Sequence, residues 1–203
     1  MTAYSEVITR LISALESLPG IGPKSAERII FHILKTDEAY ACALADAIVE
    51  VKKKIFFCEI CFNLSEKNIC HICSNPSRNH EIICVVEEPK DVIAIEKAGG
   101  YNGVYHVLLG ALSAINGIGP SKLKIEELFE RIHSGAIEEV ILATNPNADG
   151  DATALYLSQL LAKEAIKISR ISRGVPLGSS FEYLDQATIA CALRDRQPIH
   201  LIQ

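Results

Sequence analysis

The chain has 203 residues, of which 49% are hydrophobic and 22% are charged, a composition typical of a soluble globular protein with one sizeable domain and small modules. No apolar run approaches the roughly 18–20 residues of a membrane span, and the N-terminal residues lack the apolar stretch of a secretory signal. We therefore expect a cytoplasmic protein without a membrane partner. A formal net charge of −5 argues against a generally basic nucleic-acid-binding protein and leaves only local basic patches for such contacts.

The first module, residues 1–56, is expected to be helical. Apolar residues at positions 8, 11, 12, 15 and 18 follow a 3.6-residue period, and the segment 26–34 continues it. Seven Lys and Arg residues balance seven Asp and Glu residues here, so the whole negative net charge lies in residues 57–203. This module is therefore the better candidate for contact with an anion.

A glycine turn joins two of these helices in the string LPGIGPKSAERIIFHIL, residues 18–34. Glycine permits a tight turn and a close approach of the backbone, and Pro23 is suited to the first turn of a helix whose N–H groups can hold a phosphate. Basic side chains follow at four-residue steps and share one helix face. The segment resembles a helix-hairpin-helix, a module that grips the DNA backbone without reading sequence. The residues expected to bind DNA are Gly20, Gly22, Lys24, Arg28 and His32.

Two observations bear on this interpretation. An ordinary αα-hairpin with a glycine turn and a solvated charged face would show the same pattern. A second GIGP string, residues 117–120, suggests a repeat, but the segment before it is a poor helix partner. We expect that second string to form a connecting loop.

The second module, residues 57–80, carries four cysteines in the spacing C-x₂-C-x₈-C-x₂-C. Each C-x₂-C pair can turn both sulfurs toward one ion, and four thiolates complete a closed tetrahedral Zn²⁺ site with no position left for water or substrate. We expect Cys58, Cys61, Cys70 and Cys73 to hold one structural Zn²⁺ per chain. Ordinary buried or redox-active thiols are the alternative, and His71 is a possible replacement ligand. Core positions are expected for Cys42, Cys84 and Cys191.

The third module, residues 81–175, alternates strands and helices, which predicts a parallel sheet covered on both faces. The expected strands are residues 82–86, 104–109, 139–144 and 166–172, and the expected helices are 89–97, 125–132 and 151–165.

Acidic and amide side chains follow two of these strands. Glu87 ends the first strand, and the string NPNAD, residues 145–149, follows the third. This arrangement resembles the Toprim domain of topoisomerases and primases, which places a glutamate after the first strand and a D-x-D-x-E cluster after the third. Here Asn145 and Asn147 stand where the family has its two leading aspartates, which removes two charges from a Mg²⁺ site. Asp149 and Asp151 are placed to cap the following helix and to stabilise its N-terminus.

The order of the three motifs resembles the RecR family of bacterial recombination mediators over essentially the whole chain, and residues 172–193 are similar to that family's terminal segment. The fold class is thus α/β: a Toprim-like parallel-sheet domain preceded by a helix-hairpin-helix module and a small four-cysteine zinc motif. The resemblance implies that the last module, residues 176–203, contains a Walker B-like region and an assembly helix. No G-x-x-x-x-G-K-[ST] motif is present, which argues against ATP hydrolysis.

The resemblance implies a non-enzymatic factor of DNA repair, associated with the nucleoid, that binds single- and double-stranded DNA without sequence preference. It implies a homotetrameric ring that encircles DNA and acts with RecO and RecF to load recombinase onto single strands. The depleted Toprim site, Glu87 with Asn145, Asn147, Asp149 and Asp151, would then serve partner binding.

Two other functions are left open by the residues. A Mg²⁺-dependent nuclease or primase-like enzyme would use Glu87, Asp149 and Asp151. A protein-interaction scaffold would have no affinity for DNA.

Overall fold

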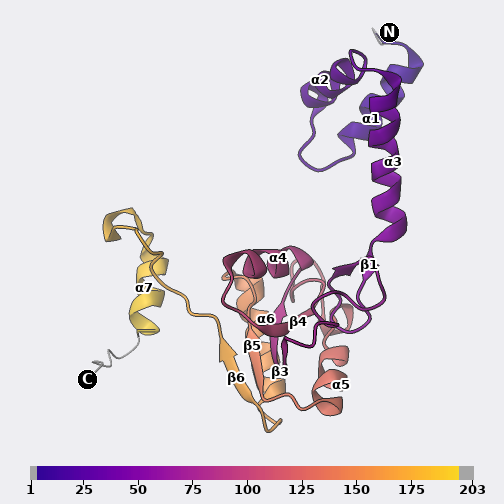
Figure 1. Cartoon of the computed structure of the whole chain (residues 1–203). Helices are drawn as coiled ribbons and strands as arrows, with labels where there is room; N and C mark the ends of the chain where they lie inside the picture. Colours follow the sequence, from indigo (N-terminus) through magenta and orange to yellow (C-terminus); the bar gives the residue numbers. More distant parts are fainter. Residues whose placement is uncertain (1–3, 197–203) are drawn as a thin grey trace. The chain divides into compact units, whose positions relative to one another are not determined.

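The computed structural model describes residues 4–196 and divides the chain into two compact units, Met1–Ile55 and Phe56–Gln203. Within the described part, no helix combines the length and apolar character needed to cross a bilayer. Figure 1 shows the helices of the first unit and the sheet with its helices in the second.

The first unit consists of three helices: α1 (Glu6–Glu16), α2 (Pro23–Ile33) and α3 (Glu38–Lys54). The turn between α1 and α2 requires glycine at position 20, where φ is +81°, a conformation that L side chains rarely adopt. Asp37 caps α3 by accepting a hydrogen bond from the backbone N–H of Tyr40 at 2.8 Å. The described part of this unit buries only Ala26 and Ile30.

The second unit begins with the cysteine segment and continues into a four-stranded parallel sheet. A short antiparallel pair, β1 (Phe56–Phe57) and β2 (Leu64–Ser65), lies within the cysteine segment. The parallel strands have the order β4-β3-β5-β6. They are β3 (Asn79–Val86), β4 (Gly103–Val107), β5 (Glu139–Leu142) and β6 (Lys167–Arg170). The predicted α/β fold with a parallel sheet is confirmed.

The connections explain how both faces of the sheet are covered. The helices are α4 (Pro89–Ala98), α5 (Glu126–Ser134) and α6 (Ala148–Leu161). The chain moves from β3 to β4 in one direction and then, through α5 and α6, in the other direction to β5 and β6. Because such crossovers are right-handed, α4 covers one face and α5 and α6 cover the other. The direction reverses between β3 and β5, so their carboxyl ends form the switch point where open α/β sheets bind ligands.

The chain after β6 ends with two short elements, a 3₁₀ turn η2 (Phe181–Tyr183) and helix α7 (Gln186–Arg194). Residues 197–203 of the predicted terminal module lie outside the described residues. The second GIGP string forms a turn followed by a 3₁₀ segment, η1 (Pro120–Lys122), and no helical hairpin. It is therefore the connecting loop that was expected.

Two cysteine predictions are wrong. Cys42 is exposed, because α3 buries none of its residues, and Cys191 is only half-buried on α7. Cys84 is buried as predicted, and this burial raises the pKa of its thiol to about 12. It lies on the central strand β3, which explains why it alone of the three belongs to the core.

Candidate metal centre and nucleic-acid interface

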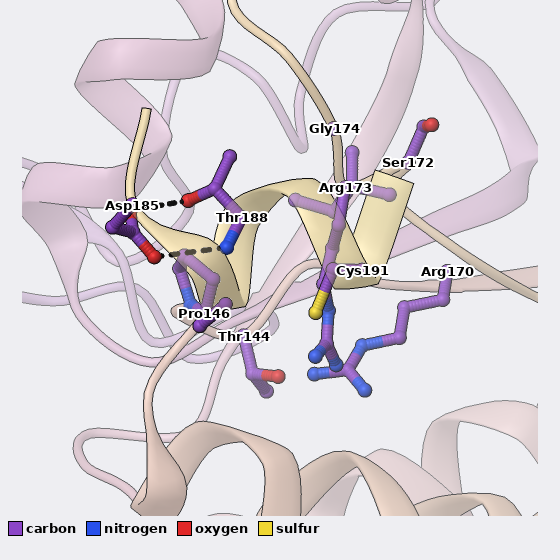
Figure 2. A pocket seen from close by; sticks show the side chains of 11 residues that line it. Thr144, Pro146, Arg170, Ser172, Arg173, Gly174, Asp185, Thr188 and Cys191 are labelled. Carbon is purple, nitrogen blue, oxygen red and sulfur yellow. Dashed lines mark hydrogen bonds between the residues drawn. The ribbon is translucent and has the colours of Figure 1, made fainter. Parts of the chain in front are cut away.

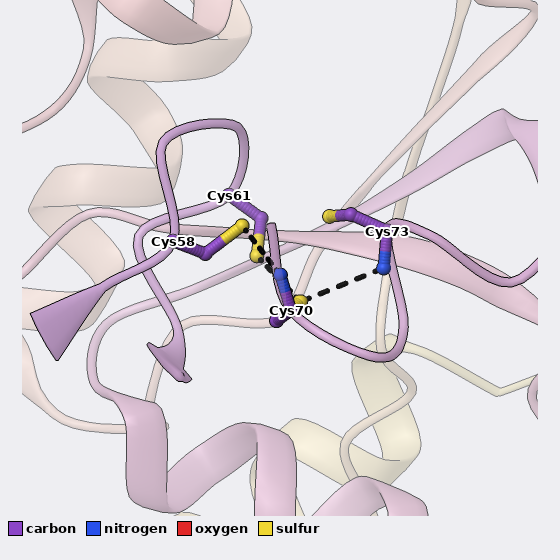
Figure 3. A group of neighbouring side chains, drawn as sticks. All are labelled: Cys58, Cys61, Cys70 and Cys73. Carbon is purple, nitrogen blue, oxygen red and sulfur yellow. Dashed lines mark hydrogen bonds between the residues drawn. The ribbon is translucent and has the colours of Figure 1, made fainter. Parts of the chain in front are cut away.

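The four cysteine sulfurs meet at one buried point of the second unit. Their Sγ atoms all lie within 4.8 Å of one another, and the Cys61 and Cys70 sulfurs are 3.5 Å apart (Figure 3). A tetrahedral ion with Zn–S bonds near 2.3 Å would separate its sulfurs by about 3.8 Å. His71 is exposed and is not part of this cluster. The donor set therefore fits one Zn²⁺ held by four thiolates.

Backbone turns position these sulfurs. The backbone N–H of Cys70 donates to the Cys58 sulfur at 3.3 Å, and that of Cys73 donates to the Cys70 sulfur at 3.5 Å. Phe62 closes the first knuckle with a positive φ of 61°. N–H groups that donate to sulfur favour the thiolate form, which is the form that binds a metal.

The zinc segment shares its core with the parallel sheet. The backbone N–H of Val107 donates to the Cys61 carbonyl oxygen at 2.8 Å. The ring of Phe62 meets the edge of buried His106 with 5.5 Å between ring centroids. His106 lies 2.6 Å from the Lys124 carbonyl oxygen through Nε2, and burial lowers its pKa to about 4, so it is neutral at pH 7. The metal centre is thus joined to the sheet by a backbone hydrogen bond and by an edge-to-face aromatic contact.

The carboxyl ends of β3 and β5 bring together two of the predicted Toprim residues. Glu87 is only 7% exposed. Its Oε1 accepts the backbone N–H of Asn145 at 2.8 Å, and its Oε2 accepts the Asn145 side-chain amide at 2.6 Å. An aspartate at position 145 has no side-chain N–H to donate to a carboxylate. The asparagine therefore occupies both oxygens of the glutamate with hydrogen bonds.

The remaining acids do not join this pair, and the capping prediction is wrong. Helix α6 begins at Ala148, three residues earlier than predicted, and its cap is Asn147, whose side chain accepts the Gly150 N–H at 2.7 Å. Asp149 and Asp151 lie in the first turn, where their charge still favours the helix N-terminus. Among residues 4–196, the four cysteines form the only group of three or more suitable side chains close enough for a metal.

Asp151 is held by two arginines that the sequence analysis missed. Arg170 Nη2 donates to Oδ1 at 2.6 Å, and Arg173 Nη1 donates to Oδ2 at 2.9 Å. Partial burial raises the pKa of Asp151, but the bonds from these arginines outweigh it and hold the pKa below its ordinary value. The sequence signal for this contact was an acid in the first turn of one helix and two arginines at and just after the end of the next parallel strand, since the start of that helix and the end of that strand lie at the same edge of the sheet.

The first unit presents its basic residues to solvent. Lys24, Arg28 and His32 are all exposed on α2. Gly22 is the N-cap of this helix and supplies no capping side chain, and no side-chain cap is present at the helix N-terminus. Such an end, with exposed cations on the same helix, is suited to a phosphate.

Comparisons with known proteins match every module. Family models match as the RecR helix-hairpin-helix over residues 8–52, the RecR zinc finger domain with four cysteines over 55–75, the Toprim domain over 81–172, and the RecR C-terminal region over 174–197. A protein called Recombination protein RecR from Koribacter versatilis (strain Ellin345) is 48% identical over 98% of this chain and 100% of its own. Proteins of the same name from Moorella thermoacetica and Bifidobacterium animalis subsp. lactis are 47% and 49% identical over 97% of this chain and 98% of theirs.

Proposed function

Because this chain belongs to the RecR family of recombination proteins, we propose that it is a non-catalytic mediator that binds DNA without sequence preference. It acts as a ring-shaped clamp on the nucleoid, with RecO and RecF as partners, and helps to load recombinase onto single-stranded DNA. The observation that carries the DNA-binding part is the exposed row of Lys24, Arg28 and His32 behind the glycine turn, within the region that matches the RecR hairpin.

The hairpin contacts suit the sugar-phosphate backbone of DNA. Lys24, Arg28 and His32 are spaced by four residues on α2, so their side chains project from one helix face. The contacts available are cationic side chains and a helix end, which hold phosphate and carry no base information. Binding is therefore expected to be independent of sequence, for single and double strands, and to weaken as salt concentration rises.

Self-association is supported by exposed apolar side chains in the first unit. Val7, Ile48 and Val51 are 68%, 65% and 62% exposed on α1 and α3. Pairing these faces between copies would bury them and would bring several basic hairpins together. A homotetrameric ring would add four weak DNA contacts through avidity, so each hairpin needs only modest affinity.

The absence of catalysis is proposed from the contacts of the acids. Both oxygens of Glu87 accept hydrogen bonds from Asn145, and the carboxylate of Asp151 is paired with two arginines. A two-metal phosphoryl site needs these carboxylates free and close together. The surface around this switch point, with Glu87, Asn145, Asn147, Asp149 and Asp151, is instead proposed to bind RecO- and RecF-type proteins. Metal-dependent DNA nicking that disappears in Glu87→Gln would establish the nuclease alternative.

The DNA-binding assignment is tested with Lys24→Ala/Arg28→Ala. We expect a folded protein whose affinity for a fluorescent oligonucleotide falls at least tenfold, because two phosphate contacts are lost. Each lost contact should also make the slope of log affinity against log salt concentration shallower by about one. Fluorescence anisotropy at several salt concentrations measures both quantities. Lys53→Ala and Lys97→Ala remove exposed charges elsewhere and serve as controls. Unchanged affinity and salt slope in the double variant would refute the hairpin contact.

A further inference from the structure

Four arginines line one cavity of about 540 Å³ beyond the end of β6. Arg170 ends the strand and Arg173 follows it, while Arg194 ends α7 and Arg196 lies just after that helix. Figure 2 shows the guanidinium groups of Arg170 and Arg173 next to each other. The sequence places these four cations in two separate segments, and the fold brings them to one cavity.

The charge of this cavity is only partly balanced. Asp151 pairs with Arg170 and Arg173, and Asp195 lies 3.4 Å from the Nε of Arg194. Four guanidinium groups thus face two carboxylates, which leaves an excess of two positive charges. A phosphate monoester carries a charge of about −1.5 to −2 at pH 7 and would therefore neutralise more of the arginine charge than the single carboxylate of Asp151 does.

Asp151 already shows how an oxyanion is held there. Arg173 binds it in bidentate fashion, with Nη1 2.9 Å from Oδ2 and Nη2 2.6 Å from Oδ1. This planar fork matches two oxygens of a phosphate as well as those of a carboxylate. The Asp151 side chain is 45% exposed, so it can turn toward solvent when a more highly charged anion arrives.

A second cavity of about 530 Å³ adjoins the first and shares residues 170–173 with it. Its other lining residues include Thr144, Pro146, Asp185 and Thr188, whose hydroxyl, carboxylate and apolar groups suit an organic substituent more than an inorganic ion. Both cavities lie near the carboxyl edge of the parallel sheet, the edge at which such sheets hold phosphorylated ligands.

We propose that Arg170, Arg173, Arg194 and Arg196 bind the phosphate monoester group of a nucleotide or of a 5′-phosphorylated DNA end. Asp151 is the internal counter-ion that this group displaces, and the adjoining cavity receives the attached sugar and base. The site is separate from the hairpin of the first unit, so its test does not depend on the DNA contact proposed for α2.

In the test, the full-length zinc-loaded protein is titrated with inorganic phosphate and with AMP, and binding is measured by isothermal titration calorimetry. Saturable binding in the millimolar range or tighter is expected from the wild-type chain. Arg173→Gln should weaken AMP binding about tenfold, because one charged bidentate contact is lost. Asp151→Asn should strengthen it, since the competing carboxylate is removed. Lys97→Gln, which loses an exposed charge on α4, should leave it unchanged.

Two outcomes would overturn the proposal. The first is the lack of saturable binding of both phosphate and AMP to the wild-type protein. The second is weaker AMP binding in Asp151→Asn. That result would show that Asp151 only holds the arginines in place and does not compete with the ligand for them. Circular dichroism and zinc content establish that each variant is folded. If Arg173→Gln does not fold, the wild-type and Asp151→Asn titrations decide.

A second comparison identifies the source of the phosphate. Oligonucleotides of one sequence, with and without a 5′-phosphate, are titrated into the Lys24→Ala/Arg28→Ala protein. Preference for the phosphorylated strand assigns the site to DNA ends, whereas tight AMP binding without such a preference assigns it to free nucleotides. The absence of both, even if inorganic phosphate binds, would also overturn the proposal.

Discussion

The hydrogen-bonded pair of Glu87 and Asn145 offers the sharpest test of how the Toprim site has changed. Asn145→Asp replaces the amide, which donates to Glu87 at 2.6 Å, with a second carboxylate. A hydrogen bond to a charged group contributes about 1.5–3 kcal/mol to the free energy of unfolding, and this contribution is lost when the buried glutamate has one donor fewer. Two carboxylates about 4 Å apart repel by up to about 4 kcal/mol at an effective dielectric constant of about 20.

These two terms overlap, because the new carboxylate can turn toward solvent and lower the repulsion. We therefore expect Asn145→Asp to lower the free energy of unfolding by about 3 kcal/mol, and Asn145→Ala, which loses only the hydrogen bond, by about 1.5 kcal/mol. Urea unfolding of the zinc-loaded proteins, monitored by circular dichroism, measures both. An aspartate variant that is as stable as the alanine variant would refute the like-charge argument.

Magnesium provides the complementary measurement. The aspartate variant restores one carboxylate of a Mg²⁺ site beside Glu87, so the ion should bind the folded state and stabilise it by about 1.4 kcal/mol at about ten times its dissociation constant. Neither the wild-type protein nor Asn145→Ala should gain stability from Mg²⁺ beyond the effect of a sodium salt at matched ionic strength. A wild-type gain equal to that of the aspartate variant would show that Asn145 does not close the site.

Further predictions concern the zinc centre, the switch point and a partly buried ion pair. Cys58→Ser should lose zinc, measured by atomic absorption, and should destabilise the second unit before any direct effect on DNA affinity; a stable, zinc-loaded variant would contradict this. Gly150→Ala should lower the thermal midpoint, because its Cβ would overlap the Asn145 carbonyl oxygen. The hydrogen bond from Arg78 lowers the pKa of Glu96 in the folded protein, so the ion pair stabilises the fold fully above the unfolded-state pKa near 4.5 and this stabilisation is lost as the pH falls further. Glu96→Gln should remove this pH dependence of the unfolding free energy, measured from about pH 7 to pH 3.

Local pattern and spacing were sufficient for the modules but not for the contacts of the site. The paired cysteine spacing predicted a four-thiolate cluster because zinc geometry leaves few other solutions, and the β-branched runs predicted a parallel sheet. The partners of Glu87 and Asp151 depend on which strands become neighbours, since Asn145 and Arg173 come from separate strand ends. Cys42 was misjudged for a related reason: an apolar segment is buried only if another element covers it, and none of the described elements buries that part of α3.

The first residue of helix α6 was predicted wrongly because the sequence contains several residues that could cap it. Asn147, Asp149 and Asp151 are all capable of capping a helix, and periodicity alone favoured the last of them. The structure uses Asn147, because its side chain reaches the Gly150 N–H while Gly150 leaves room for Glu87. The requirement for glycine at this position comes partly from a side chain at the end of another strand, which no local pattern contains.

The small number of buried side chains in the first unit has a consequence for how it folds. Ala26 and Ile30 are its buried residues within the described range, and a unit of this size is marginally stable even with a full core. Its apolar faces on α1 and α3 gain burial only when another surface covers them. If copies pair through these faces as proposed, mass action makes the order of the hairpin depend on protein concentration, and dilution should loosen α2, the helix proposed to contact DNA, as the copies separate. Affinity for DNA and the degree of assembly would accordingly rise together with protein concentration, because both would report the same association equilibrium.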